Sequence, residues 1–252
     1  MEDNPSEAIL NNVYSTKVVA DMSVKYGVKK FVMISTDKAV NPTNVMGCSK
    51  RICEIYVQSL NKAEEDGKVK GKTQFITTRF GNVLGSNGSV IPIFEQQIKN
   101  GGPVTVTHPD IVRFFMLIPE ACKLVLEAGV KGHGGEIFAF DMGEPVRIAD
   151  LAKRLIRLSG AKDVKIEYTG LREGEKLYEE VISNAEDSLP SFHEKIRIAR
   201  VREYDYAEAC RQIEHLVEVA KTYDAMATVK LMKEMVPEYV SNNSVYSELD
   251  KK

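Results

Sequence analysis

A hydroxyl, a carboxylate and an ammonium stand side by side at Thr36, Asp37 and Lys38, directly after the apolar run 30–35. A second ammonium, that of Lys50, follows Met46 at helical spacing. In open α/β sheets, ligands bind beyond the carboxyl ends of the strands, so these side chains would be placed to do chemistry on a small molecule. A carboxylate and an amine can give and take protons, and a neighbouring hydroxyl can relay one.

The same residues also fit a simpler interpretation. Asp and Lys after a strand are typical of a polar turn, with Asp37 capping the turn and Lys38 in solvent. Lys50 fits the exposed face of an amphipathic helix, and Met46 fits an ordinary core position. The local sequence favours the turn, so the chemical interpretation depends on the rest of the chain.

Helix and strand signals alternate around these residues. Apolar periodicity predicts helices over about 5–26 and 46–62, and β-branched, apolar runs predict strands at 31–35 and 74–79. Beyond residue 88 the predicted elements are shorter: helices near 90–99, 119–128, 148–158, 206–222 and 225–235, and strands near 104–106, 137–140, 164–168 and 195–199. This alternation predicts an α/β fold with parallel strands joined by right-handed crossovers. The polar residues 241–252 predict a frayed tail.

Composition and charge argue against several classes of protein. A chain of 252 residues with a net charge of -2 and a pI near 6.2 has no general affinity for nucleic acid or anionic membranes. The apolar runs are too short to span a bilayer and the acidic start is unlike a signal peptide, so we expect a cytoplasmic protein with no membrane segment. Four scattered cysteines without a C-x-x-C pair, and four widely spaced histidines, predict neither a disulfide framework nor a metal site.

Three loops carry candidates for holding a phosphorylated ligand. The stretch 79–90 is rich in glycine, asparagine and serine, and a helix begins near Ser89, where backbone amides can meet a phosphate. Arg113 and Arg172 come from distant loops and could clamp a diphosphate between them. A flexible connector and two surface ion-pair partners are the simpler interpretations of these segments.

Taken together, these stretches are more specific than any one of them. Residues 35–51 (Ser-Thr-Asp-Lys-Ala-Val-Asn-Pro-Thr-Asn-Val-Met-Gly-Cys-Ser-Lys-Arg) resemble the active-site segment of the extended short-chain dehydrogenase/reductases. More narrowly, they resemble the nucleotide-sugar 4,6-dehydratases of the polysaccharide biosynthesis protein family. The resemblance continues in the same order through the segments 79–92, 104–110, 113–116, 141–146 and 169–180.

The resemblance implies an NAD-assisted redox reaction within a UDP-sugar, with UDP-N-acetylglucosamine as the expected substrate. Hydride leaves C4 for the nicotinamide, water is eliminated across C5 and C6, and hydride returns to C6, which gives a 4-keto-6-deoxy sugar. By the family's pattern, Asp37 protonates the departing 6-hydroxyl, Lys38 takes the C5 proton, and Thr36 helps to deprotonate the 4-hydroxyl. Such an elimination needs one group that gives a proton and another that takes one.

The resemblance also implies the binding residues. Ser35 and Lys50 would contact the cofactor, with Lys50 on the nicotinamide ribose. Met46 occupies a position in the active site where most short-chain dehydrogenases carry a tyrosine, and a thioether cannot deprotonate an alcohol. A methionine at this position is similar to the pattern in one branch of the family, whose members are larger and membrane-tethered. The residues expected to bind the substrate are Asn82, Ser89, Val90, Arg113, Arg172 and Glu175.

No G-x-G-x-x-G follows a predicted strand, since the glycine cluster 132–135 precedes one. By the resemblance, residues 1–88 are the C-terminal part of a Rossmann-like domain and residues 89–240 a smaller α/β region that binds the nucleotide sugar. The turn that holds the adenosine half of NAD would then lie before residue 1. We therefore expect an incomplete NAD cradle and impaired activity, with a homo-oligomer (through helices 5–26 and 46–62) or a missing N-terminal half completing the enzyme. The alternatives are a non-catalytic UDP-sugar-binding remnant and a nucleotide-sugar epimerase.

Overall fold

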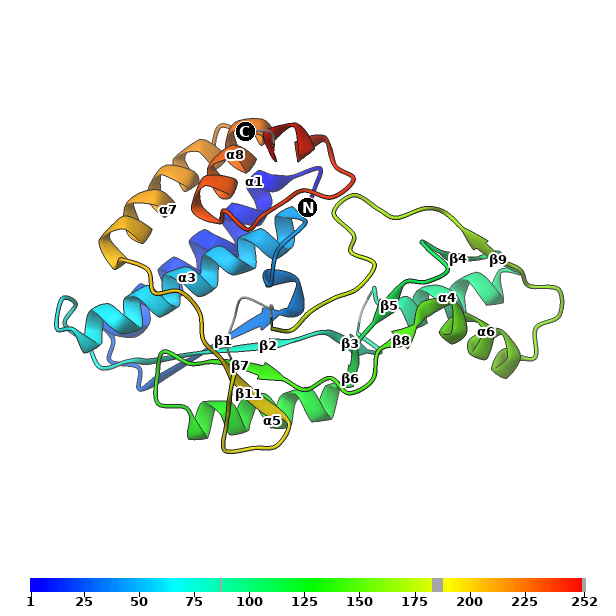
Figure 1. Ribbon diagram of the computed structural model, residues 1–252, viewed down its shortest axis with the longest axis horizontal. Helices are drawn as coiled ribbons and strands as arrows, with labels where there is room; N and C mark the ends of the chain where they lie inside the picture. Colours follow the sequence, from blue (N-terminus) through cyan, green and yellow to red (C-terminus); the bar gives the residue numbers. More distant parts are fainter. Residues whose placement is uncertain (87, 183–187, 251–252) are drawn as a thin grey trace.

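A five-stranded sheet in the order β1-β2-β7-β11-β10 lies at the centre of the structure, a computed structural model that describes residues 1–86, 88–182 and 188–250 (Figure 1). β1 (Lys30–Thr36), β2 (Gln74–Phe80) and β7 (Ile137–Phe140) are parallel, whereas β11 (Ile196–Ala199) and β10 (Ser188–Pro190) are antiparallel to their neighbours. Strands buried on both faces read as continuous apolar or β-branched runs, as β2 and β7 do. The predicted α/β fold with a Rossmann-like parallel sheet is confirmed.

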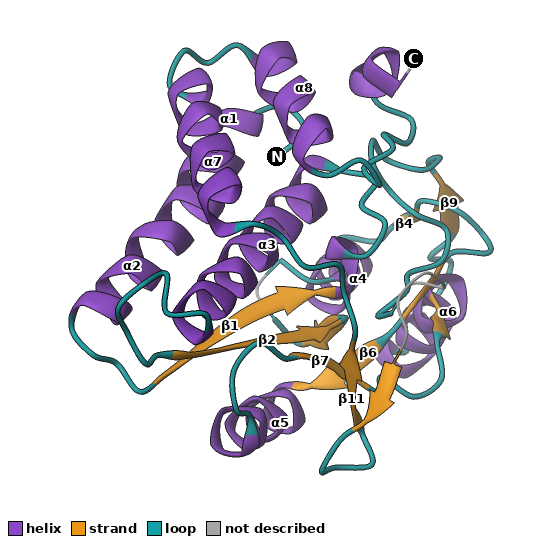
Figure 2. Cartoon of the chain, turned by 60° about the vertical axis from the view of Figure 1, so that its left-hand side comes forward, coloured by secondary structure: helices purple, strands orange, loops and turns teal. Residues whose placement is uncertain are grey.

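A layer of helices covers one face of this sheet (Figure 2). The segment expected as one helix over 5–26 is helical throughout, but its middle has π-helical winding. Gly27 ends it with a φ of 66°, a left-handed conformation that costs glycine little. The layer consists of α1 (Pro5–Ala8), the π-helical η1 (Ile9–Tyr14), α2 (Ser15–Lys25), α3 (Val45–Glu65), α7 (Tyr206–Ala220) and α8 (Ala225–Met235). α7 and α8 pack on α3, so α3 is covered within the chain, whereas Val19 and Met22 of α2 are exposed.

A smaller lobe stands beyond the carboxyl ends of β1 and β2 (Figure 1). Its core is formed by residues such as Phe94, Val104 and Ile148. It consists of α4 (Val90–Lys99), α6 (Ile148–Ser159), the parallel pair β4 (Val104–Val106) and β9 (Ile166–Tyr168), and the antiparallel pair β5 (Val112–Arg113) and β8 (Val146–Arg147). α5 (Ile118–Lys131) covers the second face of the main sheet, and β3 (Asn82–Leu84) pairs with β6 (Phe115–Leu117). Strands of two or three residues are too short to show a period, and β3, β5, β6, β8 and β10 were not predicted.

The expected division of the chain at residue 88 differs from the observed packing. β7 and β11 belong to the same sheet as β1 and β2, and α7 and α8 share a hydrophobic core with α3. The smaller lobe is therefore built from residues between about 88 and 180, interrupted by β6, α5 and β7. The sequence predicted one contiguous second region, because apolar periodicity does not show which distant segments pack together.

Residues 241–250 are ordered in the structure, in contrast to the expected fraying. Val245–Asp250 forms a 3-10 helix, η3, in which Tyr246 is buried and donates a hydrogen bond to the carbonyl oxygen of Glu2. Lys233 Nζ lies 2.5 Å from Asp250 Oδ1. Polar composition suggested exposure, but these polar groups find partners on the helical layer. Residues 251–252 lie outside the described residues.

In the part of the chain that the structure describes, no helix combines the length and the apolar character needed to cross a membrane.

Candidate active site

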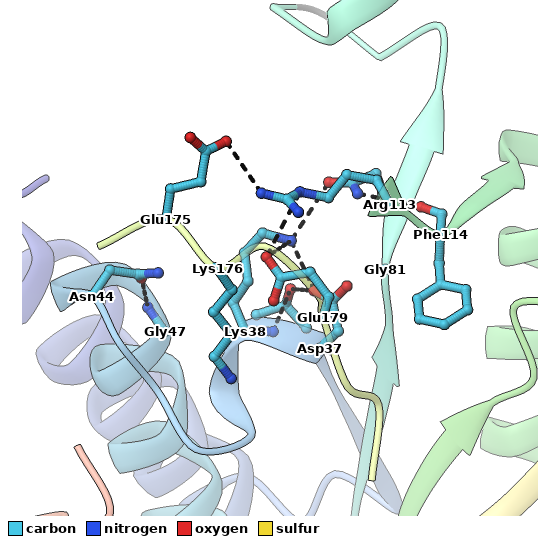
Figure 3. A network of polar contacts seen from close by, with 12 residues as sticks. Asp37, Lys38, Asn44, Gly47, Gly81, Arg113, Phe114, Glu175, Lys176 and Glu179 are labelled. Atoms are coloured by element: carbon cyan, nitrogen blue, oxygen red, sulfur yellow. Dashed lines mark hydrogen bonds and ion pairs between the residues drawn. The ribbon is translucent and has the colours of Figure 1, made fainter. Parts of the chain in front are cut away.

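β1 places the predicted acid/base segment at the carboxyl end of the sheet, where Asp37–Ala39 form a 3-10 turn. Thr36 Oγ1 and Lys38 Nζ both donate hydrogen bonds to Asp37 Oδ1, at 2.8 and 2.9 Å. Figure 3 shows Lys38 beside Asp37. Asp37 is fully buried, and within the described residues its Oδ2 has no hydrogen-bond partner. The side chain of Lys38 is only 21% exposed. A solvated polar turn does not fit this burial, and an unpartnered buried carboxylate oxygen costs free energy unless a ligand supplies a donor.

A second buried carboxylate, Glu179, faces the same lysine, and the sequence analysis did not identify it. Its Oε1 lies 3.7 Å from Lys38 Nζ and 3.8 Å from Arg113 Nε, and its side chain is 3% exposed (Figure 3). Its Oε2 has no partner among the described residues. Burial raises the pKa of Glu179, and the negative charge of Asp37 adds to this effect, whereas Lys38 and Arg113 oppose it. Glu179 lies in a glutamate-rich segment, and no local signal distinguishes it from its neighbours.

Two glycines allow other segments to pack closely around this cluster. A Cβ atom at Gly81, just after β2, would lie 2.9 Å from Asp37 Oδ2. A Cβ atom at Gly47 would lie 2.1 Å from the carbonyl oxygen of Lys38, so the first turn of α3 packs directly on the acid/base segment. Asn44 begins α3 by accepting a hydrogen bond from the Gly47 amide at 2.7 Å. This packing brings Met46 to the same side as Lys38.

The six residues predicted to bind the substrate line one cavity of about 350 Å³ between the sheet edge and the smaller lobe. Arg113 Nη2 donates a hydrogen bond to Glu175 Oε1 at 3.1 Å. Ser89 precedes α4 without capping it, and its Oγ is buried and unpartnered in the described part of the chain. The start of α4 and the two arginines bring positive charge to this cavity, and the carboxylate of Glu175 offsets part of it. The six residues are Asn82, Ser89, Val90, Arg113, Arg172 and Glu175.

A second cavity, of about 290 Å³, is lined by Lys38, Met46 and Glu179. It adjoins the first because Arg113, Arg172 and Glu175 line both. The structure thus brings the acid/base segment and the arginine loops to one continuous cleft. In this cleft, the larger cavity carries the predicted substrate-binding residues, and the smaller cavity carries Lys38 and the carboxylate of Glu179.

Four candidates, Ser35, Thr36, Asp37 and Lys50, line neither of these two cavities, and of the acid/base segment only Lys38 lines one. The hydroxyl of Ser35 is buried and donates to Glu54 Oε1 at 2.6 Å, and Lys50 is partly exposed on α3. Glu54 also accepts hydrogen bonds from Arg79 and Arg51. Burial alone would raise the pKa of Glu54, but the two arginines outweigh it and hold the pKa at about 2. Within residues 1–86, 88–182 and 188–250, no group of three or more acidic, histidine or cysteine side chains is placed to bind a metal ion.

The sheet, the polar cluster at its carboxyl edge and the smaller lobe form the architecture of the extended short-chain dehydrogenase/reductases. Residues 1–201 match the family described as "Polysaccharide biosynthesis protein", and the chain belongs to this family. The capsular polysaccharide biosynthesis protein CapD of Staphylococcus aureus is 56% identical over 219 residues, which cover 86% of this chain and 36% of CapD. A UDP-glucose 4-epimerase of Rickettsia felis is 36% identical over 243 residues, covering 94% of this chain and 69% of that protein. The chain thus spans about a third of the length of CapD.

Solved structures show the same fold. Pen from Bacillus thuringiensis superposes with a TM-score of 0.70 at 37% identity and covers 77% of this chain and 60% of that one. A double mutant of DesIV, a dTDP-glucose 4,6-dehydratase from Streptomyces venezuelae with NAD and DAU bound, gives a TM-score of 0.58 at 19% identity, covering 65% and 54%. At this lower identity, DesIV supports the fold alone.

Proposed function

We propose that this chain supplies the acid/base residues and the substrate cleft of an NAD-dependent nucleotide-sugar 4,6-dehydratase that acts on a UDP-sugar such as UDP-N-acetylglucosamine. The observation that supports the proposal most is the buried carboxylate of Asp37, which binds Thr36 and Lys38, has an oxygen without a partner among the described residues, and lies next to the cavity that Lys38 lines. The family and the relative CapD are named for polysaccharide biosynthesis, which uses nucleotide sugars, and these names specify no reaction.

The two adjoining cavities suit the two halves of a nucleotide sugar. Arg113, Arg172 and the free amides at the start of α4 would bind the diphosphate in the larger cavity. The sugar would then extend into the smaller cavity toward Lys38 and Met46. This placement puts the reacting carbons of the sugar next to the acid/base cluster.

The hydrogen bonds of the cluster define a path for the protons. Thr36 donates to Asp37 Oδ1, so a proton taken from the 4-hydroxyl by Thr36 can pass to Asp37. Asp37 then gives this proton to the 6-hydroxyl, which leaves as water. Lys38 takes the C5 proton and returns it to C5 later, so Lys38 and Asp37 both end in the protonation states in which they began. When bound, NAD supplies the hydride acceptor for C4 and the donor for C6.

The chain fits the nicotinamide end of such a cofactor better than its other end. Met46 and Lys38 line the smaller cavity, and Lys50 follows on the same helix, where it would hold the nicotinamide ribose. No G-x-G-x-x-G sequence follows a strand of the described residues, and the turn of this motif is what holds a dinucleotide pyrophosphate in Rossmann folds. We therefore expect this chain to bind NAD weakly by itself.

A C4 epimerase is the second candidate, because the Rickettsia felis relative is named a UDP-glucose 4-epimerase. Epimerisation at C4 oxidises and reduces one carbon and eliminates no water, so it needs no acid for a leaving hydroxyl. The buried neighbours Asp37 and Lys38 therefore favour dehydration over epimerisation. A non-catalytic UDP-sugar-binding chain is the third candidate.

Product analysis distinguishes these candidates. The chain at high concentration is incubated with NAD and UDP-N-acetylglucosamine, and the products are identified by NMR. The proposal expects slow formation of a UDP-4-keto-6-deoxy sugar, loss of this product in Asp37→Asn, and UDP binding by both proteins in calorimetry. UDP-N-acetylgalactosamine as the product would establish the epimerase, and UDP binding without product from the unmodified chain would support a binding module. Absence of UDP binding in the unmodified chain would contradict all three.

A further inference from the structure

The segment that follows α8, residues 239–250, is termed the C-terminal strap here. Its first part runs beside the loop that joins Lys38 to α3. The amide of Val240 donates to the carbonyl oxygen of Pro42, and the amide of Asn242 donates to that of Thr43, both at 3.2 Å. The strap is thereby hydrogen-bonded to the acid/base side of the cleft.

Asn242 also reaches the opposite side of the cleft, the loop 171–175. Its carbonyl oxygen accepts a hydrogen bond from the Gly174 amide at 2.6 Å, and its side-chain amide donates to the Glu175 carbonyl oxygen at 2.7 Å. The neighbouring Asn243 donates to the carbonyl oxygen of Leu171 at 2.9 Å. Asn242 therefore bridges two loops that are about 130 positions apart in sequence. The two loops also contact each other directly, because the Thr43 hydroxyl donates a hydrogen bond to the Gly174 carbonyl oxygen.

The bridged loop carries groups of the proposed diphosphate site. Arg172 and Glu175 line both cavities, and the Arg172 amide donates to Glu175 Oε2 at 3.0 Å. The loop lies between β9 and β10, and its described residues form no helix or strand of their own. Its position therefore depends on side-chain and strap hydrogen bonds, and these place it tightly against α3: a Cβ atom at Gly174 would lie 2.4 Å from that of Asn44.

The strap is itself fixed to the helical layer. Lys233 of α8 donates to Ser241 Oγ at 2.8 Å and pairs with Asp250, whose Oδ2 accepts from the Ser241 amide at 3.0 Å. The Tyr246 hydroxyl donates a hydrogen bond to the carbonyl oxygen of Glu2, next to the N-terminus. Figure 1 shows the strap (red) beside the N-terminus and close to the loop that follows β9. The strap is thus anchored by hydrogen bonds to α8 and to the N-terminus, and from there it can hold the loop in one place.

We propose that Asn242 is a positioning residue for the substrate: it holds the loop 171–175 against the segment 38–44, so that Arg172 stays at a fixed place relative to Lys38. The ligand class in this inference, a nucleoside diphosphate, rests on the proposed function. The claim that Asn242 orders the loop is independent of the proposed function, and this order can be measured without any ligand.

The first experiment measures amide hydrogen exchange of the loop in the whole chain. Asn242→Ala removes the side-chain hydrogen bond to Glu175 and loosens the pairing around it. We expect the amides of residues 173–176 to exchange about tenfold faster, as the loss of roughly one net hydrogen bond predicts. Amides of β2 should be unchanged. Ser247→Ala is the matched control, because Ser247 lies in the strap and its hydroxyl makes, within the described residues, one long hydrogen bond to the Ser241 carbonyl oxygen, at 3.5 Å.

The second experiment measures UDP affinity by calorimetry in a double-mutant cycle. Asn242→Ala should weaken UDP binding about five- to tenfold, and it should have no further effect in an Arg172→Ala background, because it acts through Arg172. Thermal unfolding of the single variant should stay close to that of the unmodified chain. If Asn242→Ala does not fold, Asn243→Ala tests the same inference through its hydrogen bond to Leu171.

The outcomes separate the inference from the proposed function. Equal losses of affinity in both backgrounds, or loop exchange that stays slow in Asn242→Ala, would overturn the positioning role. If the unmodified chain binds no UDP, the proposed function fails, and the exchange experiment still decides whether Asn242 orders the loop.

Discussion

Two clusters of buried charge adjoin the carboxyl end of β1, and their polar atoms are satisfied to different degrees. In the core cluster, Glu54 receives hydrogen bonds from Ser35, Arg51 and Arg79. In the cleft cluster, Asp37 Oδ2 and Glu179 Oε2 have no partner among the described residues. The carboxylates of Glu54 and Asp37 are both fully buried, so burial alone does not explain the difference.

The contrast begins with the alternation of side chains along a strand. Ser35 and Thr36 are neighbours and point to opposite faces, so Ser35 joins the core cluster beneath α3 and Thr36 joins the cleft cluster. A buried charge whose hydrogen bonds are all made fixes the fold. A buried charge that lacks partners costs stability, and proteins retain such groups where function needs them. We therefore assign structure to the first cluster and chemistry to the second.

The largest expected effect is on stability, in the core cluster. Glu54→Gln removes the buried carboxylate that binds both Arg51 and Arg79 and should destabilise the fold by about 3–5 kcal/mol, which urea unfolding would measure. Glu208→Gln, at an exposed ion pair with Arg211, is the control and should change little. A Glu54→Gln protein as stable as the unmodified chain would remove the basis of the comparison.

The same cluster predicts a direction for acid unfolding. The pKa of Glu54 is lowered from 4.5 to about 2 in the folded state, where burial opposes the shift and the arginines cause it. Its contribution to stability is therefore complete above pH 4.5 and is lost as the pH falls toward 2. Urea titrations between pH 6 and pH 2.5 should show a fall in stability that is much smaller in Glu54→Gln.

The cleft cluster predicts the opposite pattern: a large loss of chemistry with little loss of stability. Asp37→Asn should reduce formation of the 4-keto sugar by about 10²–10⁴-fold, the usual contribution of a general acid. Its unfolding free energy should change much less than that of Glu54→Gln, because Asp37 Oδ2 already lacks a partner among the described residues and Lys38 still faces Glu179. Severe unfolding of Asp37→Asn would show that Asp37 is a structural residue like Glu54.

The smallest effect is expected at Glu179. Its folded pKa is raised above 4.5, chiefly by burial, so its ionised form is disfavoured in the folded state. Ionisation then costs stability at pH 7, and the cost disappears below pH 4.5, where the carboxyl is protonated whether the chain is folded or unfolded. Glu179→Gln should therefore be at least as stable as the unmodified chain at pH 7, with no gain at pH 4. A marked loss at pH 7 only would mean that its charge stabilises Lys38 and Arg113.

Much of the fold and the site follows from the sequence, and the reasons are local. β1, α3 and the segment 36–38 were predictable because apolar periodicity and the order strand, polar residues, helix are properties of adjacent residues. The charges of Arg113 and Arg172 suggested a diphosphate clamp, but the family resemblance was needed to favour it over two separate surface ion pairs, since nothing local relates two loops so far apart.

The residues that were missed depend on distant contacts. Glu179 is one glutamate among several, and its burial is set by Lys38 and Arg113 from other segments. Asn242 lies in a polar stretch that looked frayed, and its role depends on two loops that meet it only in the folded chain. The packing of α7 and α8 on α3 was missed for the same reason.

The central claim is that Lys38, from the cleft cluster, reaches C5 of a sugar, and proton exchange tests it without any hydride transfer. The chain is mixed with a UDP-4-keto-6-deoxy-N-acetylhexosamine in D₂O, and the C5 proton signal is followed by NMR. We predict that the unmodified chain replaces this proton with deuterium well above the protein-free rate and that Lys38→Met does not. Equal exchange in both proteins, or none above the protein-free rate in either, would contradict the account.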